Sequence, residues 1–187
     1  RWFAIATGVS AYLGSIVWTL ERRAAGTLFV GLAATFSGMG VGFAFWGAAE
    51  PNWLGLLSAA ATAGVLGGTV TGMLLGHWYL TAPTMSIAPL VQLTRILGIA
   101  LLIRLAVSIV AFVVGMEAIQ GSLLWTWFAL RWLAGIAGPL VLCGMTLRIL
   151  RYRNTQAATG VLFAAVILSF IGEMAGALLS GELGRPF

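Results

Sequence analysis

Residues 60–77 read AATAGVLGGTVTGMLLGH, an apolar stretch without Asp, Glu, Lys or Arg that ends at the chain's only histidine. Small residues recur in it at every fourth position: Ala60, Gly64, Gly68, Gly72 and Gly76. Residues four apart lie on one face of an α-helix, and helices in lipid associate where small side chains let their backbones approach closely. The stretch therefore predicts a membrane helix with a glycine zipper that packs against another helix.

Two other apolar runs contain small residues that predict close packing or bending. Ala34, Gly38 and Gly42 form a second ladder at the same spacing, so the second run is the expected partner of the first glycine face. Gly135, Gly138 and Pro139 lie together in a later run, and a proline removes a backbone hydrogen bond. We therefore expect a bend in the helix of that run.

The composition places the whole chain in a lipid bilayer. Hydrophobic residues make up 60% of the 187 residues and charged residues 8%, against about 25% in soluble domains. The net charge of +5 does not indicate a nucleic-acid partner, because such a surface needs basic residues clustered on a water-exposed domain. No segment of this chain builds such a domain.

Six apolar runs are long enough to cross a hydrocarbon layer of about 30 Å, which takes about 20 helical residues. They cover approximately residues 2–20, 25–48, 54–80, 96–116, 123–147 and 157–179. The connections between them are short and polar. We therefore predict an all-α, polytopic membrane protein, a six-helix bundle that forms one domain over residues 1–187.

The charged residues of the connections orient this bundle, because loops on the cytoplasmic side retain arginine. Alternate connections lie on the same side of the membrane. One such set contains most of the arginines: Arg22, Arg23, Arg95, Arg148, Arg151 and Arg153. Glu50, Glu117 and Glu182 fall on the other side. The pattern predicts that the Arg148 to Arg153 segment lies in the cytoplasm and both termini outside. All basic residues are Arg and all acidic residues Glu, a bias typical of a GC-rich bacterial genome, so we expect a bacterial inner membrane. Because such a start is unusual and Arg1 is not a methionine, we expect a segment upstream of Arg1.

Three ionisable residues lie inside the predicted spans: Arg104, Arg131 and Glu173. A charge at membrane depth costs at least about 2.5–3.5 kcal/mol, so it normally faces a partner. Arg131 and Glu173 both fall in the outer halves of their spans, and we expect them to form an intramembrane ion pair. A structural salt bridge is favoured over a proton relay, because the spans contain no Asp and no second Glu or His.

A polar site is predicted on the cytoplasmic side from His77, Tyr79 and Arg104, closed by the connection that contains Pro83 and Pro89. His77 would hydrogen-bond to a quinone carbonyl oxygen or a lipid headgroup, Tyr79 or Trp78 would pack on the ring, and Arg104 would favour the anionic, reduced form. The alternative is that His77, Trp78 and Tyr79 form an ordinary interfacial belt and that Arg104 snorkels to a phosphate.

The sequence offers no ligand set for a metal centre, because Cys143 and His77 are each the only residue of their type. No metal or redox cofactor is expected on this chain alone, beyond a quinone or lipid at a shared site. The prediction is a non-catalytic accessory membrane subunit of a respiratory or photosynthetic electron-transfer complex, whose partner subunits carry the redox cofactors. The alternative is a small-solute or ion transporter, although the two halves show no inverted repeat with paired broken helices.

Overall fold

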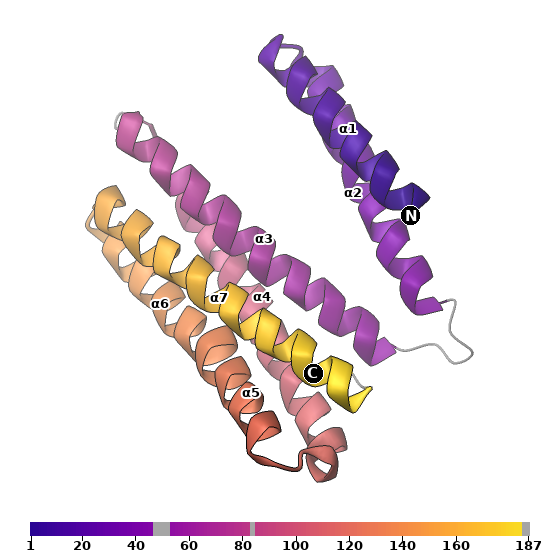
Figure 1. Cartoon of the computed structure of the whole chain (residues 1–187). Coiled ribbons are helices and arrows are strands. Elements are labelled where there is room, and N and C mark those ends of the chain that lie inside the picture. Colours follow the sequence, from indigo (N-terminus) through magenta and orange to yellow (C-terminus); the bar gives the residue numbers. More distant parts are fainter. Residues whose placement is uncertain (47–52, 83–84, 185–187) are drawn as a thin grey trace. The chain divides into compact units, whose positions relative to one another are not determined.

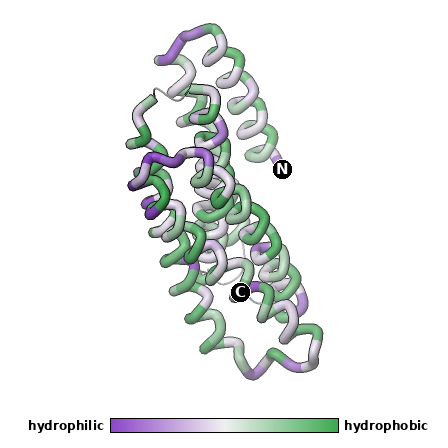
Figure 2. The backbone as a smooth tube through the Cα atoms, turned by 90° about the vertical axis from the view of Figure 1, so that its left-hand side faces the viewer, coloured by the Kyte–Doolittle hydropathy of each residue, from purple (hydrophilic) through white to green (hydrophobic). Residues whose placement is uncertain are grey.

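The computed structural model describes residues 1–46, 53–82 and 85–184, and every regular element in these residues is a helix (Figure 1). In chain order the elements are α1 (Trp2–Thr19), α2 (Arg23–Trp46), α3 (Trp53–Thr81), α4 (Ala88–Gly115), η1 (Met116–Ala118), α5 (Ser122–Trp132), η2 (Leu133–Ala137), α6 (Gly138–Arg151) and α7 (Thr155–Leu183). Because α5, η2 and α6 are continuous, the described residues contain six helices that are long and apolar enough to cross a membrane. Figure 2 shows the hydrophobic residues along these helices and the hydrophilic residues gathered at the connections.

The fourth helix differs most from its predicted bounds of 96–116. It begins at Ala88, with Pro89 in its first turn, where a missing backbone N–H costs nothing. Hydropathy marks only the apolar part of a helix, so it does not reveal the more polar first turns of α4. Arg95 therefore lies in α4 and not in a loop. Glu50 and Pro83 lie outside the described residues.

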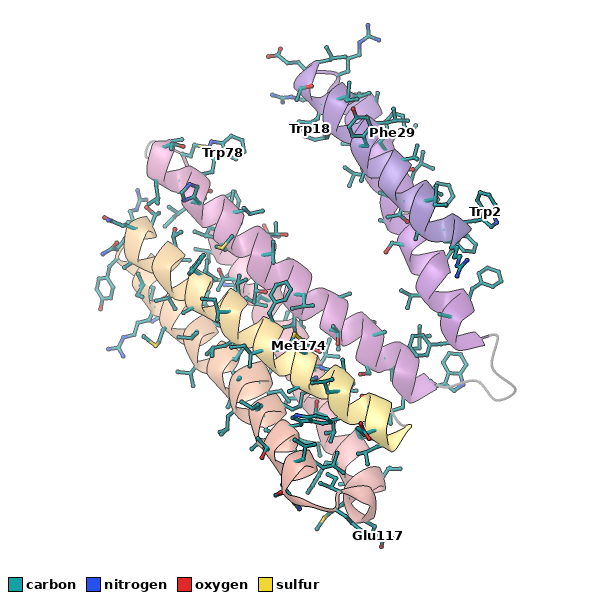
Figure 3. The ribbon with its side chains drawn as sticks, in the orientation of Figure 1. Trp2, Trp18, Phe29, Trp78, Glu117 and Met174 are labelled. Atoms are coloured by element: carbon teal, nitrogen blue, oxygen red, sulfur yellow. The ribbon has the colours of Figure 1, made fainter. Side chains whose placement is uncertain are left out.

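The chain divides into two compact units, Arg1–Leu56 and Leu57–Phe187, and each is described by itself. In the first unit α1 and α2 form a helical hairpin whose contact depends on glycine. A Cβ at Gly26 would lie 2.3 Å from a ring atom of Trp18, and one at Gly14 would lie 3.0 Å from Cβ of Phe29. Figure 3 shows both aromatic side chains in this hairpin. The single domain over 1–187 stays a prediction.

The second unit has two zones along its length. Its apolar core lies toward the end where α3 ends and α4 begins, and comprises Val65, Tyr79, Leu90, Leu97, Leu101, Cys143, Leu150, Ala158 and Leu162. Side chains such as Trp78 and Met174 point away from this core and are exposed (Figure 3). The other zone, toward the start of α3 and the end of α4, contains buried charges.

The glycine face of α3 packs against two helices of the second unit. A Cβ added to these glycines would meet Ala100 and Leu97 of α4 from Gly64 and Gly68, and Leu162 and Thr159 of α7 from Gly72 and Gly76. The reason is geometric: at 3.6 residues per turn, positions four apart drift by about 40° around the helix. Over the length of the ladder the face therefore turns from α4 to α7. The expectation that the second apolar run covers this face is wrong.

Candidate functional site

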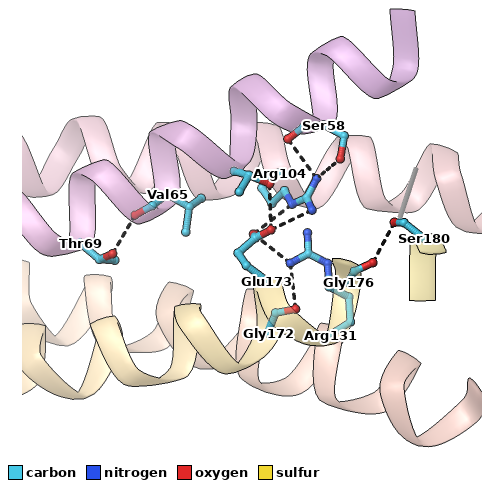
Figure 4. A network of polar contacts seen from close by, with 10 residues as sticks. Ser58, Val65, Thr69, Arg104, Arg131, Gly172, Glu173, Gly176 and Ser180 are labelled. Atoms are coloured by element: carbon cyan, nitrogen blue, oxygen red, sulfur yellow. Dashed lines mark hydrogen bonds and ion pairs between the residues drawn. The ribbon is translucent and has the colours of Figure 1, made fainter. Parts of the chain in front are cut away.

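Three charged side chains from three helices meet inside the second unit (Figure 4). Arg104 comes from α4, Arg131 from α5 and Glu173 from α7. Nη2 of Arg104 lies 3.0 Å from Oε2 of Glu173, and Nη1 of Arg131 lies 2.9 Å from Oε1. The exposed fractions of the three side chains are 2%, 1% and 8%. We call these three residues the charge cluster.

The carboxylate of Glu173 contacts three other helices through its two oxygens, by hydrogen bonds and ion pairs. Oε1 accepts a hydrogen bond from Nε of Arg104 at 3.2 Å and forms the ion pair with Arg131. Oε2 accepts from Nη2 of Arg104 and from the hydroxyl of Thr62 on α3 at 2.8 Å. Nη1 of Arg104 donates to the carbonyl of Ser58 at 3.3 Å and to its hydroxyl. The charge cluster therefore joins α3, α4, α5 and α7.

Glycines on α7 make the room that Arg131 occupies. A Cβ at Gly176 would lie 3.0 Å from Cδ and Nε of Arg131. At Gly172, whose carbonyl accepts from Nη1 of Arg131 at 3.4 Å, a Cβ would lie 1.9 Å from Cα of Gly135. Gly135 belongs to η2, a π-helical segment. This π-helical segment lies against α7 beside Arg131. The bend expected around Pro139 stays a prediction.

The cluster has a formal net charge of +1, because it contains two arginines and one glutamate. Arg131 is the arginine whose hydrogen-bond donors are not all used. Its Nε and Nη2 atoms are buried and have no hydrogen-bond partner among the described residues. The same edge of Arg104 holds both oxygens of Glu173. Two buried hydroxyls that have no hydrogen-bond partner in the described part of the chain lie one helical turn from the cluster, those of Ser108 on α4 and Ser169 on α7. Buried polar groups without hydrogen-bond partners destabilise a folded protein. This region is therefore the strongest candidate for a functional site inside the bundle.

Arg131 and Glu173 form the ion pair expected from the sequence. Arg104 also pairs with Glu173 and does not lie beside His77. Arg104 contacts Ser58, which is separated from His77 by about 28 Å of helix rise along α3. Along α4, Arg104 is about 24 Å from Ala88 and only about 16 Å from Gly115. The placement of Arg104 beside His77 is therefore wrong.

His77 and Tyr79 also fail to share one pocket. Two residues apart on a helix, they project about 200° from each other; His77 is exposed, whereas Tyr79 is buried in the core. The hydroxyl of Tyr79 donates to the carbonyl of Ser86 and so holds the connection that leads into α4. The three-residue quinone or headgroup site is therefore not assembled.

Sequence reasoning missed Ser58 and Thr62. These two polar residues are four apart at the start of an apolar span, so they lie on one face of α3. Such a pair in an apolar helix indicates a buried polar neighbour, because each hydroxyl needs a partner away from water. The spacing could have predicted that α3 supports the charge cluster.

The fold and the cluster together define a class of protein: all-helical, with helices long enough to cross a membrane and charges buried between them. Comparisons with protein-family models, with curated proteins and with solved structures found no match to this chain.

Proposed function

We propose that this chain is a non-catalytic integral membrane subunit of a respiratory or photosynthetic electron-transfer complex. The observation that supports a non-catalytic role is the state of Glu173, the one acidic residue within the predicted spans. Its two oxygens accept three hydrogen bonds, from Arg104 and Thr62, and form an ion pair with Arg131. A carboxylate held in this way is suited to the role of a fixed charge that ties helices together. It is less suited to passing protons along a path. In this proposal the partner subunits carry the redox cofactors.

Co-purification tests this proposal directly. We expect the tagged chain, expressed at its native level and extracted in mild detergent, to elute with other membrane subunits that contain haem, flavin or iron–sulfur centres. Mass spectrometry would identify the chains, and visible absorption would report the cofactors. An equally tagged membrane protein of similar size is the control for non-specific association. Elution of the chain by itself would contradict the proposal.

The transporter alternative is favoured by one specific observation. Arg131 has an unpartnered edge at the level of the charge cluster, and the π-helical η2 begins two residues after it. Such π-helical segments are frequent at functional sites. If the chain purifies alone and mediates anion flux in liposomes, this alternative replaces the subunit proposal.

The proposed location is a bacterial inner membrane, with the turn between α6 and α7 in the cytoplasm. We expect a cysteine at position 152, where Tyr152 is 78% exposed, to react with a membrane-impermeant maleimide only from the cytoplasmic side. Glu117→Cys, at the opposite end of the second unit, should react only from the outside. Both variants are made in a Cys143→Ala background, and labelling of sealed vesicles of known orientation measures the reaction. The reverse pattern would overturn the orientation.

A further inference from the structure

A cavity of about 560 Å³ lies at the end of the second unit where α4 begins and α6 turns into α7. Its polar lining is Ser86, Gln92, Arg95 and Arg153, and its apolar lining includes Ile87 and Val91. We call it the basic pocket. It is far from the charge cluster, because Arg95 and Arg104 are separated by about 13 Å of helix rise.

The two arginines of the basic pocket have no counter-charge in it. Neither the Arg95 nor the Arg153 side chain forms a hydrogen bond or ion pair with any residue that the structure describes, and no acidic residue lines the cavity. Two guanidinium groups that face one cavity attract an anion, and a guanidinium fork matches the oxygens of a phosphate. The pocket is therefore built for a phosphate-like group.

The local backbone places both exposed arginines at the pocket. On α4, Ala88, Val91, Gln92 and Arg95 follow the spacing of one helical face. Arg153 lies in a tight turn with φ 55°, where its N–H donates to the Leu150 carbonyl at 3.0 Å. A residue other than glycine costs about 1 kcal/mol or more in this conformation. The charged side chain is thus held at a position where glycine would be favoured on conformational grounds.

The pocket is lined by apolar as well as polar side chains, which favours a lipid over a free ion. Ile87, the residue before α4, and Val91 of α4 line the same pocket as the two arginines. The helix α4 is long and apolar enough to cross a membrane. Basic pockets between membrane helices bind the headgroups of anionic lipids. We propose that the basic pocket binds the phosphate group of an anionic phospholipid, with Arg95 and Arg153 as the two donors. This inference does not depend on the electron-transfer proposal.

Lipid retention by the purified chain tests the inference. The chain is equilibrated in detergent with equal amounts of phosphatidylglycerol and phosphatidylcholine, washed, and analysed for bound lipid by native mass spectrometry. We expect the wild-type chain to retain phosphatidylglycerol preferentially. One basic residue near an anionic headgroup changes affinity about fivefold, so Arg95→Gln and Arg153→Asn should each lower the affinity about fivefold and their combination about 25-fold.

The matched control is Arg151→Gln, because Arg151 is exposed in the last turn of α6 and does not line the pocket. It removes the same charge and should change affinity less than twofold. Asn is chosen at position 153 because it tolerates a positive φ, and Arg95→Gln tests the pocket separately if that turn fails to form. Equal losses from Arg151→Gln and Arg153→Asn would overturn the inference, and so would the absence of any lipid preference.

A separate arm distinguishes the lipid from free phosphate. Inorganic phosphate alone, added at millimolar concentration to the wild-type chain, should leave phosphatidylglycerol bound. Full displacement at that concentration would assign the pocket to free phosphate and overturn the lipid inference. Because all these measurements use the isolated chain, they succeed or fail independently of co-purification with redox subunits.

Discussion

Replacing Glu173 by Gln is expected to destabilise the second unit by about 3–5 kcal/mol, because it leaves two buried arginines without a counter-charge. The amide has one acceptor oxygen in place of two, and its N–H₂ group would face the guanidinium donors. In detergent the variant should lose helical circular dichroism at a markedly lower temperature than the wild-type chain. A melting temperature equal to that of the wild-type chain would show that the charge cluster contributes nothing to stability.

The control for this prediction removes all three charges at once. Replacing a whole buried ion cluster by apolar residues of similar volume is often neutral or stabilising. We therefore expect the triple variant Arg104→Met, Arg131→Met and Glu173→Leu to melt closer to the wild-type chain than Glu173→Gln does. If it folds and still co-purifies with the same partners, the cluster has a structural role. If it folds but loses those partners, the cluster contributes to function.

Replacing Gly172 by Ala is expected to cost about 3 kcal/mol or more, at the upper end of overpacking effects. The added Cβ would lie 1.9 Å from Cα and 2.2 Å from the backbone nitrogen of Gly135. Backbone atoms of a packed helix cannot rotate away as a flexible side chain can, so α7 and η2 must separate. The separation would also move Gly172 and the neighbouring Glu173 away from Arg131. Thermal unfolding in detergent measures the loss.

Gly160→Ala is the matched control on the same helix, because a Cβ at Gly160 meets no atom within 4 Å. Alanine is about 1 kcal/mol better than glycine inside a helix, so this variant should melt at the same temperature as the wild-type chain or slightly above it. Equal destabilisation by the two substitutions would show that the crossing at Gly135 and Gly172 is not the cause.

The sequence by itself determined the helices and the kinds of groups they contain. Length and hydropathy are properties of each run alone, so six apolar helices followed from the printed residues, with bounds that differ mainly where α4 begins at Ala88. That Arg104, Arg131 and Glu173 need partners followed from the cost of a buried charge. Local chemistry therefore predicted which residues would require an explanation.

Only the tertiary structure decided which of these residues meet. The glycine ladder faces α4 and then α7 because a four-residue repeat drifts around its helix. Arg104 pairs with Glu173 and not with the region of His77, because α4 starts two turns earlier than its apolar run and places Arg104 nearer to Gly115. The basic pocket unites α4 with the turn at Arg153, far away in sequence. Rotation and axial position of a helix depend on packing between helices, which no single run encodes.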